Sequence, residues 1–176
     1  MEILSNEKVR LRAVEPTDAE VIFKIERNDI GKADSCWYAP ISFESVLQYA
    51  LNYDADPFAA KGVRLVIEER VDKKIVGLID LYELDKANSR AFVAIYILEE
   101  YRNLGFGKGA LEILCRYADK VLGLHQLVAK VIEDNDNSFK LFLSCGFEAG
   151  TELKDWLYDA SSRCYRKVTV YQKIFS

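Results

Sequence analysis

The sequence predicts a single α/β (α+β) domain over residues 1–176, with a mixed central sheet of about seven strands flanked by four helices. Three observations support this fold class. Short apolar or alternating segments separated by turn residues predict strands, and apolar residues at helical spacing predict helices between them. No repeat, linker or low-complexity segment divides the chain, and its 176 residues, half of them apolar, suffice for a substantial core.

The first third of the chain predicts one strand and two helices. Apolar and polar residues alternate over Lys8–Ala13, which predicts a strand. Thr17 as an N-cap and Glu20 three residues later form a predicted capping box that starts the first helix. A polar, aromatic-rich stretch over residues 28–40 leads to a second predicted helix around residues 43–53.

The remainder predicts six strands and two further helices. The strands are expected over residues 64–69, 75–84, 90–98, 126–132, 147–158 and 163–174. One helix follows a glycine-rich loop and ends at Gly123, a residue type that commonly terminates helices. The last helix covers residues 138–145, is capped by residues 134–137 and ends at Gly146.

Composition and charge exclude several classes of protein. The net charge of −4 and the lack of a basic patch argue against a nucleic-acid partner. No segment approaches the ~20 apolar residues of a membrane span, and the start is no signal peptide, so we expect a cytoplasmic protein without a membrane partner. The four cysteines form no C-x-x-C pair and His125 is the only histidine, so neither a disulfide framework nor a metal site is expected.

The most informative motif is Arg-Asn-Leu-Gly-Phe-Gly at residues 102–107, between a predicted strand and a predicted helix. The glycines let the backbone bend and let a phosphate approach, and the unpaired N–H groups of the first helical turn attract an anion. A Walker A loop would need Ser or Thr after Lys108, but Gly109 follows. The glycine spacing and late position do not fit a dinucleotide fingerprint either. The motif therefore predicts a pyrophosphate site of a third type.

This R-x-x-G-x-G pattern resembles the coenzyme A loop of the GNAT acyltransferases. A second stretch resembles the family's N-x-x-S-x-x-L-Y-x-x-x-G-F motif, through Asn135-Asp136-Asn137-Ser138, Leu141-Phe142 and Cys145-Gly146-Phe147. With the predicted element order βααβββαβαββ, the resemblance to the GNAT acyl-CoA N-acyltransferase fold covers nearly the whole chain. The nearest likeness is to bacterial spermidine N-acetyltransferases and ribosomal-protein-alanine N-acetyltransferases, whose tail is similar to residues 165–171.

The resemblance implies acetyl-CoA as co-substrate, with no metal, and a set of residues that hold it. These are Tyr96, Ile97, Arg102, Asn103, Leu104, Gly105, Phe106, Gly107, Lys108, Asn135 and Ser138. Pantetheine would pair with the backbone of Tyr96 and Ile97, pyrophosphate would lie over the N–H groups of residues 104–108, and Arg102 would shape the start of the loop. The Ile97 N–H would face the oxyanion. Plain helix capping is an equally open role for Asn135 and Ser138.

The implied reaction is direct attack of a primary amine on the acetyl thioester. By resemblance Asp80 is the acceptor-side acid and the candidate base. Strand alternation places Glu83 on the opposite face, where a solvated charge is the preferred interpretation. Residues 26–62 would shape the acceptor pocket, and the residues expected to bind the acceptor are Trp37, Tyr38, Asp80 and Phe92. Core packing is an equally open role for Trp37 and Tyr38.

The acceptor is predicted only as a class: a polyamine-like small molecule, an amino sugar or a peptide N-terminus. Scarce acidic residues weaken the polyamine case. Phe142 stands where the family has a proton-donating tyrosine, which keeps open a catalytically weak coenzyme A-binding protein with a regulatory role. The nearby Ser144 and Cys145 are expected to pack in the core. Exposed C-terminal strand edges make a homodimer or higher homo-oligomer plausible.

Overall fold

The structure is a computed structural model that describes residues 3–29, 40–53 and 56–176. Its strands are β1 (Val9–Ala13), β2 (Val63–Glu69), β3 (Ile75–Asp85), β4 (Arg90–Ile97), β5 (Gln126–Ile132), β6 (Glu148–Asp159) and β7 (Cys164–Ile174). Its helices are α1 (Ala19–Asp29), α2 (Phe43–Leu51), α3 (Phe106–Lys120) and α4 (Asp136–Ser144). Trp37 and Tyr38, expected to bind the acceptor, lie outside the described residues.

The strands form one seven-stranded sheet in the order β1-β2-β3-β4-β5-β7-β6. Neighbouring strands are antiparallel except β4 and β5, which are parallel and joined through α3. The predicted mixed sheet with four helices is therefore confirmed. Within the described part of the chain, no helix has the length and apolar character required to cross a lipid bilayer.

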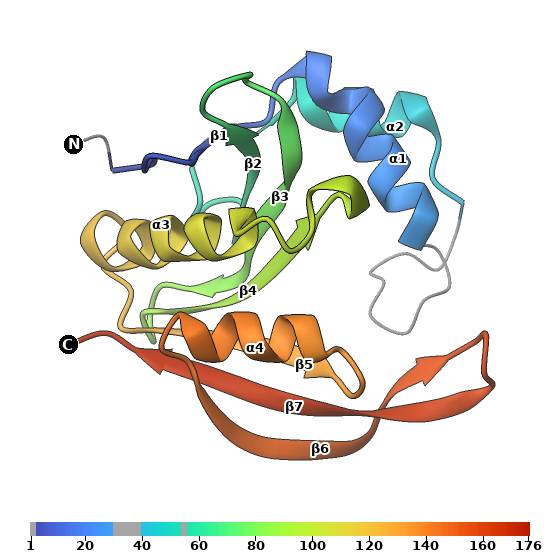
Figure 1. The fold of residues 1–176 in the computed structure, drawn as a ribbon, viewed down its shortest axis with the longest axis vertical. Coiled ribbons are helices and arrows are strands. Elements are labelled where there is room, and N and C mark those ends of the chain that lie inside the picture. The colour runs from blue at the N-terminus through green and yellow to red at the C-terminus, as the bar shows by residue number, and fades with distance from the viewer. Residues whose placement is uncertain (1–2, 30–39, 54–55) are drawn as a thin grey trace.

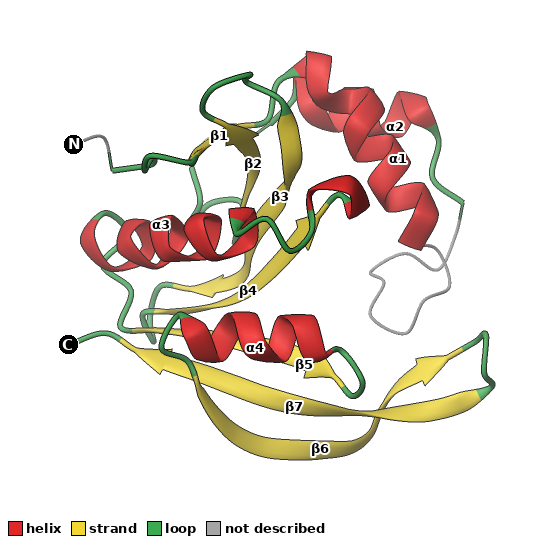
Figure 2. Ribbon diagram, in the orientation of Figure 1, coloured by secondary structure: helices red, strands yellow, loops and turns green. Residues whose placement is uncertain are grey.

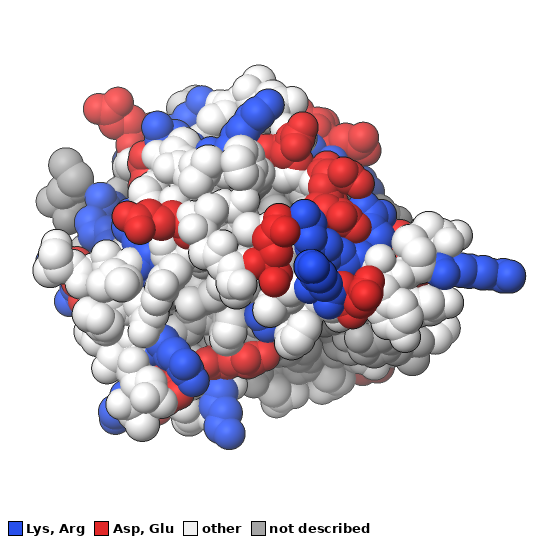
Figure 3. Space-filling model, turned by 90° about the horizontal axis from the view of Figure 1, so that it is seen from below, with Lys and Arg blue, Asp and Glu red and all other residues white. Residues whose placement is uncertain are grey.

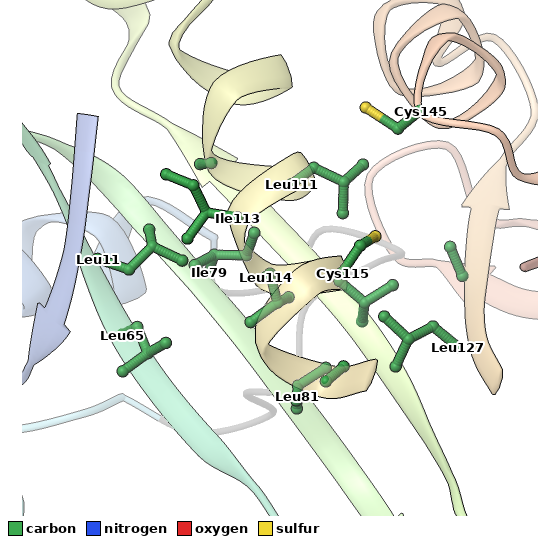
Figure 4. Packing of buried hydrophobic residues seen from close by; sticks show 14 of the residues in the cluster. Leu11, Leu65, Ile79, Leu81, Leu111, Ile113, Leu114, Cys115, Leu127 and Cys145 are labelled. Atoms are coloured by element: carbon green, nitrogen blue, oxygen red, sulfur yellow. The ribbon is translucent and has the colours of Figure 1, made fainter. Parts of the chain in front are cut away.

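The helices cover the two faces of the sheet in pairs (Figures 1 and 2). α3 and α4 pack on one face, and Figure 4 shows leucine and isoleucine side chains of α3 meeting those of β1, β2 and β3 there. α1 and α2 pack on the other face against Val66 and Leu78. Residues that pair across neighbouring strands point to the same face of a sheet. The residues that pair with Val66 and Leu78 therefore face the α1–α2 side.

The first helix begins differently from the prediction. Residues Pro16–Asp18 form a short 3₁₀ turn and α1 starts only at Ala19, so Thr17 is not the N-cap. Asp18 instead accepts the N–H of Glu15 at 2.8 Å. It also receives two hydrogen bonds from the Arg12 guanidinium, at 2.8 and 2.9 Å. The bidentate ion pair from the neighbouring strand fixes the turn at Asp18.

The Arg12–Asp18 pair gives a testable pH dependence of stability. Burial raises the pKa of Asp18, but the hydrogen bonds from Arg12 and the Glu15 N–H outweigh it, so the pKa lies below the ordinary 3.8. A carboxyl with a lowered pKa stabilises the fold above about pH 4, and this contribution is lost as pH falls through the folded-state pKa. We expect Asp18→Asn to lower the free energy of unfolding by about 3 kcal/mol at neutral pH, because it breaks a buried pair.

Urea denaturation at neutral and at acidic pH measures this effect, and the difference between Asp18→Asn and the parent should shrink in acid. Asp72→Asn is the control, since Asp72 and Lys74 form an ion pair that is more than half exposed and should contribute less than about 1 kcal/mol. Equal losses in the two variants would contradict the prediction.

Candidate active site

The parallel strands β4 and β5 separate after a short ladder. Within the described residues their pairs run from Arg90–Gln126 to Phe92–Val128, although β4 continues to Ile97. The Leu98 N–H donates to the carbonyl of Val76 beside β3, at 2.9 Å. Because successive residues of a strand direct their backbone groups to opposite edges, the N–H and carbonyl of Ile97 face the gap that opens towards β5.

The glycine-rich loop leads from this gap into α3. Gly105 is the N-cap and has a φ of 82°, in the left-handed region that favours glycine. The Lys8 ammonium donates to the carbonyl of Leu104 and lies 5.1 Å from the centre of the Phe106 ring. These contacts pin the loop to the start of β1, so that the unpaired N–H groups of the first α3 turn form an anion site.

Arg102 links the loop to the end of β4. Its Nε donates to the carbonyl of Ile97 at 3.1 Å, and its guanidinium lies 5.7 Å from the centre of the Tyr96 ring. The side chain therefore engages the Ile97 carbonyl and leaves the adjacent N–H directed into the gap. A backbone N–H fixed in this way is a suitable donor to a developing oxyanion.

A cavity of about 560 Å³ lies between β4, the loop, α3 and α4. Every residue expected to hold coenzyme A lines it except Leu104, whose side chain is exposed. Sequence reasoning missed six further lining residues: Ile95, Tyr101, Asn137, Lys140, Leu141 and Ser144. The spacing of Ser138, Leu141 and Ser144 by three along one helix was the signal that could have found some of them.

The start of α4 combines a cap with a place in the cavity wall. Asn135 accepts the N–H of Ser138 through its side-chain oxygen, at 3.1 Å. The capping role that the sequence left open is therefore present for Asn135. Both residues also line the cavity, so helix capping orients them beside the space that a ligand would fill.

Phe142 lies in the core and does not line the cavity. It is 4% exposed, and its ring packs edge-on against Phe147 and parallel to Tyr171, with centroids 5.1 and 6.4 Å away. Cys145 is buried as predicted, and burial raises the pKa of its thiol. The core prediction is wrong for Ser144, which is exposed and lines the cavity, because it shares the helix face of Leu141.

A second cavity, of about 740 Å³, lies between the α1–α2 pair and strands β2 and β3. Arg64 is its polar centre. The Arg64 guanidinium donates to both oxygens of Asp80, through Nε at 2.9 Å and Nη2 at 2.8 Å. It also donates to Glu26 at 2.5 Å through Nη1. The candidate base Asp80 is thus held in one orientation at the floor of this cavity, and residues between 26 and 62 form much of its wall.

Two tyrosines complete the wall around Arg64. The Tyr53 hydroxyl donates to the Arg64 carbonyl at 2.6 Å, and the Tyr49 ring lies 6.0 Å from the guanidinium. Burial raises the pKa of Tyr49 and of Tyr53. Both phenols therefore stay neutral at physiological pH and give the cavity an aromatic, uncharged side.

A row of paired residues leads from the second cavity to β4. Arg64 pairs with Asp80 across β2 and β3, and Asp80 pairs with the exposed Ala94 on β4, the strand that borders the gap. In the next row Phe92 stacks on Tyr82 with centroids 5.5 Å apart. Tyr82 lines the second cavity, whereas Phe92 does not line it and contacts Tyr82 from β4.

The regular strand alternation from which the side of Glu83 was predicted does not extend to that residue. A bulge interrupts the β3–β4 ladder between Tyr82 and Asp85, and Glu83 has a φ of 48° there. A bulge inserts an extra residue and breaks the alternation of faces. Glu83 is exposed, in agreement with the preferred interpretation as a solvated charge.

The arrangement of gap, loop and helix is matched in known proteins. Residues 8–148 match the family described as the acetyltransferase (GNAT) domain. The chain is a GNAT acetyltransferase. GNAT enzymes use acetyl-CoA as acetyl donor, which agrees with the cofactor class that the sequence predicts. Among the described residues, no group of His, Cys, Asp and Glu is arranged to hold a metal ion.

Relatives of this GNAT chain include N-acetyltransferases from several bacteria. It is 30% identical over 161 residues to the uncharacterized N-acetyltransferase YoaA of Bacillus subtilis, which covers 89% of this chain and 88% of the relative. It is 24% identical over 168 residues to the spermidine N(1)-acetyltransferase of Vibrio cholerae, with 95% of each chain covered. These relatives confirm the predicted likeness to spermidine N-acetyltransferases and the assignment as an N-acetyltransferase.

A solved structure gives the same fold. The crystal structure of the Vibrio cholerae spermidine N-acetyltransferase in complex with CoA and spermine has a TM-score of 0.81 and 23% sequence identity to this chain, with 96% of both chains covered. At this identity the likeness establishes the GNAT fold and does not transfer the acceptor.

Proposed function

We propose that this GNAT enzyme transfers the acetyl group of acetyl-CoA to a primary amine of a small molecule or a peptide end in the cytoplasm. The observation that carries the proposal is the gap beside Ile97, which continues into the cavity above the first turn of α3. In this arrangement the N–H groups of the glycine loop bind the pyrophosphate. The exposed edge of β4 pairs with pantetheine as a missing strand would.

The proposed reaction needs three events at the gap. The acceptor ammonium, with a pKa near ~10.4, first loses a proton, and Asp80 is the carboxylate on the row that leads to the gap. The amine then forms a bond to the thioester carbon while the Ile97 N–H stabilises the oxyanion. The carbon–sulfur bond finally breaks, the nitrogen releases its extra proton to solvent, and coenzyme A leaves as a thiolate whose pKa near ~8.5 makes it a tolerable leaving group without a protein acid.

Two observations bear on the acceptor. Several relatives are described as spermidine N-acetyltransferases, which supports an amine of small size. Within the described residues, however, both carboxylates of the second cavity are bound to Arg64. Arg64 and Lys61, which also lines this cavity, balance the charges of Glu26 and Asp80, so the described lining has no surplus negative charge to hold the several ammonium groups of a polyamine.

We also propose that the protein forms a homo-oligomer. The spermidine N-acetyltransferase of Vibrio cholerae is described as dodecameric. In this chain the β6–β7 hairpin exposes three large aromatic residues, Trp156, Tyr158 and Tyr165, each more than half exposed. Exposed aromatic residues of this kind are enriched at protein interfaces. Sedimentation analysis of the purified chain tests this part.

Thiol release from acetyl-CoA with a panel of amines tests the transfer, and calorimetry with acetyl-CoA tests binding separately. The panel should contain spermidine, an amino sugar and peptides with free N-termini. Release that depends on one acceptor class supports the enzyme. Binding of acetyl-CoA without release for any acceptor would contradict transfer and favour the weakly catalytic, regulatory coenzyme A-binding protein.

Restoring the family's tyrosine at position 142 should not restore a catalytic acid. The ring of Phe142 lies in the core, so the added hydroxyl of Phe142→Tyr would be buried. We expect kcat to change by less than about 2-fold and the free energy of unfolding to fall by about 1–3 kcal/mol. Phe139→Tyr is the matched control on the same helix, since that ring is 41% exposed. A large gain in kcat for Phe142→Tyr would contradict this account.

A further inference from the structure

Lys130 on β5 is a cation in an unusual setting. Basic and acidic side chains lie next to each other on the face shown in Figure 3, and most arginines at the sites described above are paired with carboxylates. The backbone of Lys130 pairs with Val170 on β7, but its side chain takes part in no ion pair or hydrogen bond among the described residues. Its ammonium instead lies 4.4 Å from the centre of the Phe92 ring and 5.6 Å from that of Trp156. Two aromatic faces therefore orient a charge that has no counter-ion in the part of the chain that the structure describes.

The register of the sheet places this charge beside the proposed acceptor site. Phe92 pairs with Val128 at the end of the β4–β5 ladder. Two residues further along each strand, Ala94 and Lys130 lie on that same face of the sheet, on the two sides of the gap where β4 and β5 have separated. Asp80 on β3 pairs with the exposed Ala94 on β4, and Lys130 on β5 lies across the gap from Ala94. A molecule lying over Ala94 at the gap meets a carboxylate on one side and an ammonium on the other.

The small side chain of Ala94 and the neighbouring aromatic rings limit the size and shape of a ligand that can bind over Ala94. Phe92 stacks on Tyr82 and forms an aromatic wall on one side of Ala94, while Tyr96 is two residues along β4 on the other side. Strands lie about 4.8 Å apart, so Asp80 and Lys130 are separated by at least two such spacings. That span fits a short molecule with charges of opposite sign at its ends.

We propose that Lys130 binds an anionic group of the acceptor, so that the substrate is a small primary amine that carries a carboxylate. The inference rests on the proposed acetyl transfer and names the substrate class of that same site. The amine end lies towards Asp80 and the gap, and the carboxylate end lies against Lys130 between Phe92 and Trp156. A polyamine would place a second ammonium beside Lys130, which like-charge repulsion disfavours.

Three acceptors of equal chain length test the charge requirement. Aminovalerate, pentylamine and cadaverine end in a carboxylate, a methyl group and an ammonium. We expect kcat/KM for aminovalerate to exceed that for pentylamine by about 10-fold or more, with cadaverine the poorest acceptor, as follows from one charge-assisted contact. A preference for cadaverine or spermidine would overturn the inference and leave the proposed acetyl transfer standing.

Variants of Lys130 distinguish a role in binding the acceptor carboxylate from a role in packing against the aromatic rings. Lys130→Met keeps the apolar stem between the rings, and we expect it to raise KM for aminovalerate by about 10-fold or more while pentylamine changes less than about 2-fold. Lys130→Arg should retain the preference. Lys120→Met, at the exposed end of α3 on the other face, controls for the lost net charge. Equal losses with aminovalerate and pentylamine in Lys130→Met would overturn the inference, since that pattern indicates packing alone.

Calorimetry on the coenzyme A-loaded protein distinguishes this inference from the proposed function. Tighter binding of aminovalerate than of cadaverine, lost in Lys130→Met, supports the anion site even if no amine releases thiol. If binding shows this preference but no amine releases thiol, only the proposed acetyl transfer is contradicted. Equal or absent binding of the two ligands to the parent protein would overturn the anion site, whatever the thiol assay shows.

Discussion

Replacing Gly107 by valine is expected to weaken coenzyme A binding by about 100-fold or more, which corresponds to about 2.7 kcal/mol, while the protein remains folded. A Cβ at this position would meet Ile97 and Leu141 at 3.5 Å each, which is ordinary contact. The branched side chain would then extend between β4, α3 and α4 into the cavity that the ligand needs. It would also keep a phosphate away from the N–H groups of the first α3 turn.

Gly107 is a better test position than Gly105. Gly105 has a φ of 82°, and a Cβ there would lie 3.2 Å from the Lys8 ammonium, so a substitution strains the backbone as well as the site. A bulky residue is therefore expected to leave the fold intact at Gly107 but not at Gly105. Calorimetry measures the affinity and thermal unfolding checks the fold.

Lys120→Val is the matched control for Gly107→Val. Lys120 is the last residue of the same helix and its side chain is 63% exposed, so the control adds the same β-branched residue to α3 away from the cavity. We expect it to cost less than about 1 kcal/mol of stability and to leave coenzyme A affinity unchanged. Unchanged affinity in Gly107→Val would show that coenzyme A does not bind over this loop.

Replacing Asp80 by asparagine is expected to lower kcat/KM by about 100-fold, within the range that general base catalysis contributes. Coenzyme A affinity should not change, because Asp80 lines the second cavity and not the one beside α3. Asparagine keeps the shape and one acceptor for the Arg64 guanidinium. The loss should therefore appear in the transfer rate rather than in binding of the donor.

The control for Asp80→Asn is Asp85→Asn. Asp85 is at the far end of β3, where it forms an ion pair with Arg90 at 3.3 Å. This variant should keep its acetyl transfer within about 2-fold of the parent. If Asp80 only supports Arg64, Asp80→Asn will lose stability in urea while its transfer rate at saturating acceptor stays near that of the parent, and the assignment of Asp80 to the reaction would be wrong.

Much of the proposed coenzyme A site could be predicted because its signals are local. The spacing of Arg102, Gly105 and Gly107, directly after an apolar strand, predicted a tight turn and a helix N-terminus at the right place. The N-cap of α4 at Asn135 is equally local. A local signal failed where another element intervened, because Arg12 on β1 binds Asp18 and the first helix begins only after it. The β3 bulge interrupts the strand alternation assumed for Glu83, although the residue is solvated as predicted.

The acceptor side could be predicted only in outline. Asp80 was recognised as a carboxylate of the right strand, but its bidentate partner Arg64 is 16 residues away. Lys130 gave no signal in the sequence, because its position depends on the register of β4 against β5. The core position of Phe142 likewise depends on Phe147 and Tyr171, which come from the chain after α4.

The sequence by itself determined the seven-stranded mixed sheet, the four helices, the glycine loop and the family of enzymes, because periodicity, turn residues and motif spacing act over a few residues. Only the tertiary structure decided how far β4 and β5 stay paired, which carboxylates Arg64 binds, and which side chains face Ala94. These features arise where strands distant in the chain come into register, and register is set by the packing of the whole sheet.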